Sequence, residues 1–215
     1  MSISKHIFWN KVTRPATKWE PYFAVYDKYF GPWRDRAPTF VEVGVWQGGS
    51  LEMWREFFSP GAQIYGIDID PHILNRPVPG THQVVGDQAD PAFWKTFLQQ
   101  VPQIDLFLDD GGHHMHQQIT TLECVWPHMS EQGVYICEDT HTSYQSYYGG
   151  TPENETFMSY AKKLVDLIHR NHHGGTHHSL KNSHLFSDLL SVSFYDSMVV
   201  LQKGRQKFDL VQVNA

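Results

Sequence analysis

Residues 40–50, FVEVGVWQGGS, decide the fold that this sequence predicts. A short apolar run ends at Glu42, glycines follow from Gly44 onward, and LEMWREFF continues with the spacing of a helix. This order is typical of a buried strand, a tight turn and a helix start. Glycines let the backbone come close to a ligand, and the first amides of the helix face any anionic group on it. The turn therefore favours a nucleotide-like ligand, with an ordinary glycine turn as the alternative.

The spacing in this turn narrows the class of ligand. It reads E-x-G-x-x-x-G, which differs from the G-x-G-x-x-G fingerprint of dinucleotide-binding proteins. An acidic side chain at the strand end would repel a pyrophosphate group. The turn thus favours a cofactor that is cationic or carries a carboxylate, and its candidate contacts are Glu42, Gly44, Gly48 and Ser50.

Strand and helix patterns alternate regularly after the turn. Predicted strands cover 62–69, 81–85, 104–108 and 133–137, and predicted helices cover 91–100, 116–129 and 152–170. The segments 191–196 and 197–204 read as an antiparallel pair that completes one edge of the sheet. Such alternation requires right-handed crossovers. We therefore predict an α/β fold with a doubly wound, mostly parallel seven-stranded sheet that is covered by helices on both faces.

The first 38 residues precede this pattern and are rich in aromatic side chains. Tyr22, Tyr26 and Tyr29 fall at helical spacing and predict an amphipathic helix. Its aromatic face could pack on the core or form a lid over a bound ligand. We expect residues 1–38 to be a helical lid segment and residues 39–215 to be one cofactor-binding domain.

Composition excludes several classes of partner. The 215 residues are 40% hydrophobic, enough for one well-filled core, and carry a formal net charge of -6. That charge gives no electrostatic footprint for nucleic acid or a membrane surface, so a small-molecule partner is expected. The chain start lacks the apolar core of a signal peptide, and no apolar stretch approaches the roughly 20 residues that span a bilayer. Cys124 and Cys137 lie in apolar surroundings, which predicts buried free thiols and a cytoplasmic protein.

Acidic residues end most of the predicted strands. The carboxyl ends of parallel strands share one edge of the sheet, where ligands bind in open α/β folds. Because unpaired buried acids are costly, a cationic group is expected among them. The set consists of Glu42, Asp68, Asp70, Asp87, Asp109, Asp110, Glu138 and Asp139.

Three residues at this edge suit a nucleoside. Asp68 follows Gly44 by 24 positions, which is near the separation at which an acidic side chain accepts hydrogen bonds from ribose hydroxyls. A solvated turn residue is the competing interpretation, chiefly for Asp70. Asp87 and Gln88 follow the next strand and could accept hydrogen bonds from an adenine amino group.

The motifs EVGVWQGGS, GIDID, GDQ and FLDDGGHH, in this order, resemble those of class I S-adenosylmethionine-dependent methyltransferases. LDDGGHHMHQQ and GVYICEDTHTSY are similar to metal-dependent sugar O-methyltransferases of the mycinamicin and macrocin type and their rhamnosyl relatives. The likeness runs from about residue 19 to residue 203 and implies a Rossmann-like methyltransferase domain with S-adenosylmethionine as cofactor. It further implies a Mg²⁺ ion held by Asp110, Glu138 and Asp139, with His113 as general base.

Elementary chemistry agrees with these implied roles. Asp110 and the pair Glu138 and Asp139 end consecutive strands, so their carboxylates can converge, and an all-oxygen set suits a hard cation such as Mg²⁺. A sugar hydroxyl is a poor nucleophile near neutral pH because its proton is held tightly. A nearby cation stabilises the charge that develops on the oxygen, and an imidazole such as His113 can take the proton.

The remaining polar residues of these motifs have less definite roles. Asp109 is expected to position the cofactor or the surrounding structure rather than a metal ion. His141 is a second catalytic candidate, either as a substrate contact or as an alternative base. His114 and His116 can simply face a helix surface or cap the start of that helix. The histidine-rich segment 169–178 matches no zinc pattern and is interpreted as a polar loop.

We therefore predict a Mg²⁺-dependent O-methyltransferase that acts on a sugar hydroxyl of a glycosylated natural product or polysaccharide. A catechol-type metal-dependent O-methyltransferase is the alternative among enzymes, and a non-catalytic module that binds a nucleoside cofactor is the alternative from another class. Some enlarged sugar O-methyltransferases carry an additional N-terminal domain, for which the first 38 residues leave no room. The N-terminal helix or a neighbouring subunit is expected to replace it, and we predict a homo-oligomer.

Overall fold

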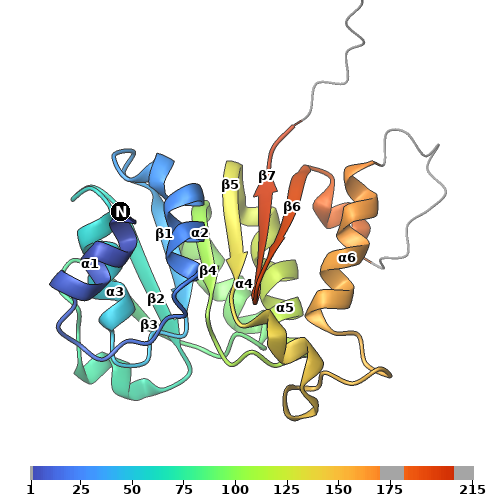
Figure 1. Cartoon of the computed structure of the whole chain (residues 1–215), viewed down its shortest axis with the longest axis horizontal. Helices are drawn as coiled ribbons and strands as arrows, with labels where there is room; N and C mark the ends of the chain where they lie inside the picture. Colours follow the sequence, from blue (N-terminus) through green and yellow to red (C-terminus); the bar gives the residue numbers. More distant parts are fainter. Residues whose placement is uncertain (1, 170–181, 206–215) are drawn as a thin grey trace, which may run out of the picture.

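A seven-stranded sheet runs through the molecule in the order β3-β2-β1-β4-β5-β7-β6 (Figure 1). The computed structural model describes residues 2–169 and 182–205. Neighbouring strands from β3 to β5 pair in parallel, whereas β7 pairs antiparallel with both β5 and β6. The strands are β1 (Thr39–Val43), β2 (Gln63–Asp68), β3 (His82–Val85), β4 (Ile104–Asp109), β5 (Met129–Cys137), β6 (Leu189–Tyr195) and β7 (Met198–Lys203). The predicted fold class, including the antiparallel C-terminal pair, is confirmed.

Helices cover both faces of the sheet because apolar residues on the strands point alternately to either side. Val41 and Val43 belong to a core with α4 (Pro91–Gln100), α5 (Met115–Val125) and α6 (Phe157–Ile168). Phe40 belongs to a second core on the other face, which includes residues of α1 (Ile3–Lys11), α2 (Tyr22–Tyr29) and α3 (Gly49–Phe57). In Figure 1, α1 and α3 lie together at one end of the molecule and α6 lies at the other.

The aromatic N-terminal helix is present as predicted and is part of the second core. Tyr22 and Tyr26 of α2 are buried, and the Tyr26 ring packs edge-on against Trp54 of α3, with 5.1 Å between the ring centroids. The helix is followed by a short 3-10 turn at Gly31–Trp33. The hydroxyls of Tyr22 and Tyr26 thereby reach Asp139 and Glu138 at the carboxyl edge of the sheet.

Two of the predicted helices prove shorter than their sequence patterns indicated. The helix predicted over 116–129 ends at Val125, because Pro127 has no amide hydrogen to continue it; a 3-10 turn follows, and β5 starts at Met129. The helix predicted over 152–170 begins only at Phe157, because the Thr156 side chain accepts a hydrogen bond from the Ser159 amide and caps the helix there.

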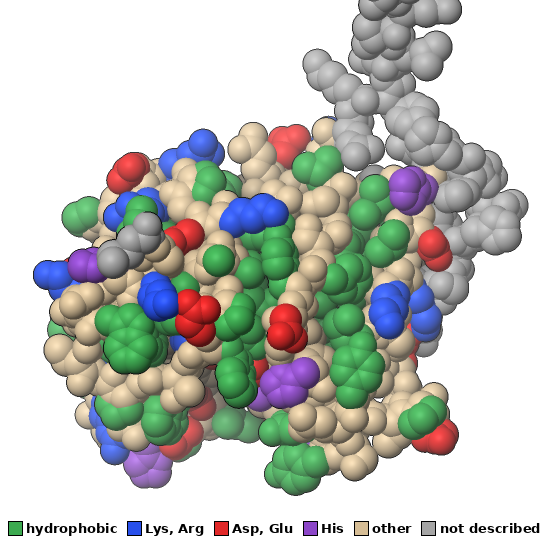
Figure 2. All heavy atoms as spheres, in the orientation of Figure 1, with side chains coloured by type: hydrophobic (Ala, Val, Ile, Leu, Met, Phe, Trp, Pro, Cys, Tyr) green, Lys and Arg blue, Asp and Glu red, His purple; other side chains and the backbone are tan. Residues whose placement is uncertain are grey.

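Charged side chains of both signs are mixed on one face of the molecule, which Figure 2 shows. None of the helices within the described ranges is both long and apolar enough to cross a membrane. The two cysteines are free thiols as predicted, although Cys124 is half-buried and only Cys137 is fully buried. Most of the histidine-rich segment lies outside the described residues, which include only His169 of its histidines.

Candidate active site at the carboxyl edge of the sheet

A cavity of about 320 Å³ opens at the carboxyl ends of β1 to β4. Its walls come from the glycine turn after β1, the loops after β2 and β3, and the turn after β4. This last turn, residues 109–112, is called the DDGG turn below. Four of the predicted cofactor contacts lie together in this lining, namely Gly44, Asp68, Asp87 and Gln88. Asp110, predicted as a metal ligand, also lines the cavity.

Gly44 is required at its position by the close approach of two turns. Its φ is +86°, and a Cβ atom placed on it would lie 1.9 Å from the carbonyl oxygen of Asp110. Any side chain here would push the DDGG turn away from β1 and strain the backbone. The glycine therefore holds the cofactor turn directly against the turn that carries the predicted metal ligand and base.

Asp68 uses its carboxylate to order the glycine turn. Its Oδ2 accepts hydrogen bonds from the amides of Val45 and Trp46 at 3.0 and 2.9 Å, and its Oδ1 accepts one from the Asp70 amide at 3.0 Å. The side chain is only half-buried and still lines the cavity, so a ribose contact stays a prediction.

Gln88 and Asp109 stabilise the DDGG turn through buried hydrogen bonds. The Gln88 amide nitrogen donates to Asp109 Oδ1 at 2.9 Å and to the Thr121 hydroxyl at 3.1 Å, and its oxygen accepts from the Gly112 amide at 2.8 Å. Burial raises the pKa of Asp109, which Tyr135 also contacts at 3.1 Å. If Gln88 contacts adenine as predicted, its side chain must give up some of these hydrogen bonds to the protein.

The other predicted cofactor residues of the turn lie away from the cavity lining. Glu42 points to the face covered by α2 and α3, where it accepts a hydrogen bond from Ser50 at 2.7 Å. Gly48 packs against the side chain of Val78. Glu42 is fully buried, its Oε1 has no hydrogen-bond partner among the described residues, and burial raises its pKa to about 7. The contacts of Glu42, Gly48 and Ser50 with a cofactor stay predictions.

Three side chains beside the cavity present donor atoms to one point. One atom each from Asp110, His113 and Asp139 lies within 4.8 Å of the others, an arrangement that could hold a metal ion. His113 Nε2 lies 3.5 Å from Asp139 Oδ2. This group contains two of the three predicted metal ligands and the predicted base.

The third predicted ligand, Glu138, is engaged elsewhere. It is buried and accepts hydrogen bonds from the Tyr26 hydroxyl and from Lys18 Nζ, the latter at 3.0 Å. Burial raises its pKa well above the ordinary value, and the nearby Asp110 carboxylate adds to this effect, whereas Lys18 opposes it.

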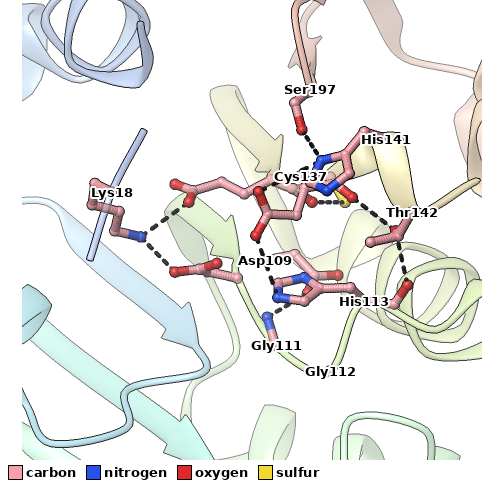
Figure 3. Close-up of polar contacts among 12 residues, drawn as sticks. Lys18, Asp109, Gly111, Gly112, His113, Cys137, His141, Thr142 and Ser197 are labelled. Atoms are coloured by element: carbon pink, nitrogen blue, oxygen red, sulfur yellow. Dashed lines mark hydrogen bonds and ion pairs between the residues drawn. The ribbon is translucent and has the colours of Figure 1, made fainter. Parts of the chain in front are cut away.

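Lys18 lies in the candidate site, although the sequence did not single it out. Its Nζ lies 2.5 Å from Asp110 Oδ2 and 3.8 Å from Glu42 Oε1, and its side chain is 2% exposed. Figure 3 shows the Lys18 ammonium joined by dashed lines to two carboxylates, which are those of Asp110 and Glu138. Burial alone would lower the pKa of Lys18, but the carboxylates of Asp110 and Glu138 raise it well above the ordinary value, so the side chain is an ammonium ion.

The two candidate catalytic histidines lie on either side of Asp139. His113 has a positive φ of 59°, and its Nδ1 is buried without a hydrogen-bond partner in the described chain. His141 Nδ1 is 2.5 Å from the Ser197 hydroxyl and 3.9 Å from Asp139 Oδ1 (Figure 3). The Tyr22 hydroxyl donates to Asp139 Oδ1 at 2.7 Å and so helps to fix this carboxylate.

His114 and His116 belong to the start of α5. His114 is the N-cap residue of that helix, and its amide donates to Gln117 at 3.1 Å. His116 is exposed. Both nevertheless line a larger cavity of about 590 Å³ together with Tyr147 and Tyr148.

This fold and this edge resemble those of class I methyltransferases, in which a glycine turn and strand-end acids surround a cavity at the carboxyl edge of a seven-stranded sheet. Comparison with known proteins agrees. A methyltransferase domain family matches residues 41–140. The chain is 37% identical over 165 residues to the 8-demethyl-8-alpha-L-rhamnosyl tetracenomycin-C 2'-O-methyltransferase of Streptomyces olivaceus, a match that covers 72% of this chain and 43% of that protein.

A second relative is the mycinamicin VI 2''-O-methyltransferase of Micromonospora griseorubida, which is 29% identical over 84% of this chain and 47% of its own length. The solved structure of the MycE methyltransferase from the mycinamycin pathway, in complex with Mg and SAH, matches with a TM-score of 0.79 and 25% identity. That match covers 98% of this chain and 56% of the other. The chain thus matches a methyltransferase domain family over residues 41–140 and is similar to sugar O-methyltransferases, of whose length it spans about half.

Proposed function

We propose that the protein transfers the methyl group of S-adenosylmethionine to a sugar hydroxyl of a glycosylated natural product or polysaccharide, with the help of a divalent cation such as Mg²⁺. The observation that carries this proposal is the double position of Asp110. It lines the cavity at the ends of β1 to β4, and it belongs to the donor group with His113 and Asp139. A methyl donor in the cavity and an acceptor oxygen at the donor group would therefore meet at this residue.

The cavity lining fits a nucleoside cofactor. The Asp68 and Asp87 carboxylates offer acceptor oxygens, and Gly44 and Gly112 leave the backbone accessible between them. S-adenosylmethionine would supply a methyl group that is already activated, so the task of these residues is to bind and orient it.

The two carboxylates of the donor group, Asp110 and Asp139, fit a hard divalent cation, which would stabilise the negative charge that develops on the acceptor oxygen and would leave His113 unbound as the base. Asp110 and Asp139 offer carboxylate oxygens as ligands. The buried ammonium of Lys18 beside Asp110 indicates that the carboxylates here need a compensating positive charge. His113 takes the hydroxyl proton, and Asp139, 3.5 Å from Nε2, stabilises the imidazolium that results. His141 contacts the acceptor in the neighbouring cavity lined by Trp19 and Tyr22.

Labelled S-adenosylmethionine, Mg²⁺ and a panel of deoxysugar glycosides test the proposal with the full chain. We expect methylated glycoside to form and a metal chelator to abolish its formation. His113→Ala should lower the rate by about 10²- to 10⁴-fold without weakening cofactor binding. His6→Ala is the matched control, because His6 is exposed on α1. Absence of cofactor binding in calorimetry, or full activity of His113→Ala on a catechol with inert sugars, would contradict the proposal.

Four further expectations accompany this function. Residues 1–38 act as the segment that closes the site, residues 39–215 form the catalytic domain, and the protein works in the cytoplasm as a homo-oligomer. The burial of Tyr22 and Tyr26 against the strand-end acids supports the first of these. Light scattering of the purified full chain would measure the number of subunits.

A further inference from the structure

A lysine ammonium lies between two carboxylates that were expected to hold a metal ion. Lys18 Nζ is 2.5 Å from Asp110 Oδ2 and 3.0 Å from Glu138 Oε2. The geometry points to Lys18 as a tethered counter-ion that holds Asp110 and Glu138 in the metal-free protein and is displaced when the divalent cation binds. This inference rests on the metal dependence proposed above.

The two cations compete because they need the same oxygens. A Mg²⁺ ion binds carboxylate oxygens at about 2.0–2.1 Å, so an ion that bridged Asp110 and Glu138 would occupy the space that Lys18 Nζ now fills. Two adjacent cations also repel each other strongly in surroundings of low polarity. As long as Lys18 remains, Glu138 is removed from the metal-binding set, and only Asp110, His113 and Asp139 converge.

Charge balance explains why a lysine is buried at this place. The site collects the carboxylates of Glu42, Asp110, Glu138 and Asp139, and Glu42 and Glu138 are fully buried. Buried carboxylates without a counter-charge are costly. A lysine that is attached to the chain supplies that charge at all times, whereas a divalent cation supplies it only when bound.

The segment that carries Lys18 is built so that the residue can withdraw. Residues 12–19 form neither helix nor strand. They are anchored on one side by the amides of Thr13 and Arg14, which donate to Glu52 of α3 at 2.7 and 3.1 Å, and by the packing of Ala16 against Gly49, and on the other side by Tyr22 at the start of α2. Between these anchors Trp19, next to Lys18, is 62% exposed. A swing of the lysine side chain, or a shift of the segment, would release the carboxylates without unfolding either helix.

Amine labelling of the wild-type full chain tests the displacement. A lysine-selective reagent is applied with and without MgCl₂, the labelled sites are identified by mass spectrometry, and Mg²⁺ binding is measured separately by calorimetry. Lys28 is the internal reference, because it is exposed on α2 and contacts Tyr195 rather than the acids. We expect Lys18 to be protected in the metal-free protein and to react about tenfold faster or more when Mg²⁺ is saturating, with Lys28 unchanged. Continued protection of Lys18 at saturating Mg²⁺ would overturn the inference.

Metal affinity provides the second readout. Lys18→Met should bind Mg²⁺ about tenfold more tightly or better, because the fraction of molecules ready to bind rises when the competitor is removed. Lys28→Met should bind as the wild type does. Equal or weaker binding by a folded Lys18→Met variant would overturn the inference, and if that variant does not fold, the labelling of the wild type decides. Failure of both the wild type and Lys18→Met to bind Mg²⁺ would instead refute the metal dependence of the proposed function, and this inference with it.

Discussion

Replacing Gln88 by leucine is expected to destabilise the protein by about 2–4 kcal/mol, even when no cofactor is bound. The change removes the two hydrogen bonds that Gln88 donates to Asp109 and Thr121 and the one that it accepts from the Gly112 amide. The bond to the fully buried Asp109 carboxylate weighs most, because a hydrogen bond to a charged group contributes about 1.5–3 kcal/mol. After the change, Asp109 Oδ1 keeps only a weak contact of 3.4 Å with the Gly111 amide.

Other consequences of this substitution are small by comparison. Leucine is close in size to glutamine, so the cavity cost is minor. The Gly112 amide belongs to an exposed residue and can bond to water instead. The expected loss therefore comes chiefly from one buried acid, and it should be accompanied by a looser DDGG turn.

Urea denaturation of the cofactor-free protein measures this loss. The midpoint should fall while the slope of free energy against urea stays constant, since the extent of unfolding is unchanged. Gln63→Leu is the control, because Gln63 is exposed on β2 and makes only a marginal 3.4 Å contact with Gly61; its effect should stay within about 0.5 kcal/mol. Wild-type stability of Gln88→Leu, combined with weakened cofactor binding, would refute the bracing role and favour a direct adenine contact.

Two further substitutions test neighbouring positions. Glu42→Gln should gain stability relative to the wild type as the pH rises, because burial raises the pKa of Glu42 from 4.5 to about 7 and the wild type loses stability across that interval. Urea denaturation at several pH values should show this gain, whereas Glu131→Gln, at an exposed position, should run parallel to the wild type. Gly44→Ala should cost about 2–4 kcal/mol through backbone strain and the clash of its Cβ with the DDGG turn. Gly31→Ala meets nothing within 4 Å and should be neutral; equal stabilities of these two variants would contradict the packing argument.

The fold was predictable because independent features of the sequence indicated the same secondary-structure elements. Alternating apolar runs, the glycine turn and the Asp90 helix cap, whose side chain accepts from the Ala92 amide at 2.8 Å, all pointed to one architecture. Errors fell at the ends of elements, since two helices proved shorter than predicted and β5 begins at Met129, four residues before the predicted start at 133. Apolar spacing continued through Trp126 to Met129, and only the proline at 127 marked the change from helix to strand.

The sequence predicted which acids gather at the carboxyl edge, but not which face of the sheet each side chain lies on. Strand-end acids were treated as one row, yet side chains on a strand alternate between faces. Asp109 points to the face of α4 and α5, where Gln88 and Tyr135 contact it. Glu42 and Glu138 point to the opposite face, which is covered by α2 and α3. Noting whether each acid falls on an odd or an even position relative to the buried residues of its strand would have assigned the acids to the two faces.

Lys18 was beyond prediction from spacing, because it lies 92 residues before Asp110 and belongs to a segment without helix or strand. The one clue to Lys18 in the sequence was the free-energy cost of burying carboxylates without a counter-charge. Glu42 and Glu138 end strands on the face covered by the aromatic helix, so at least one buried carboxylate needed a cation from the segment that packs there. Lys18 lies four residues before the first buried tyrosine of that helix, Tyr22. The same packing that places tyrosine hydroxyls on Glu138 and Asp139 thus carries the lysine to the acids, which makes the N-terminal segment part of the site and a point at which its charge can be changed.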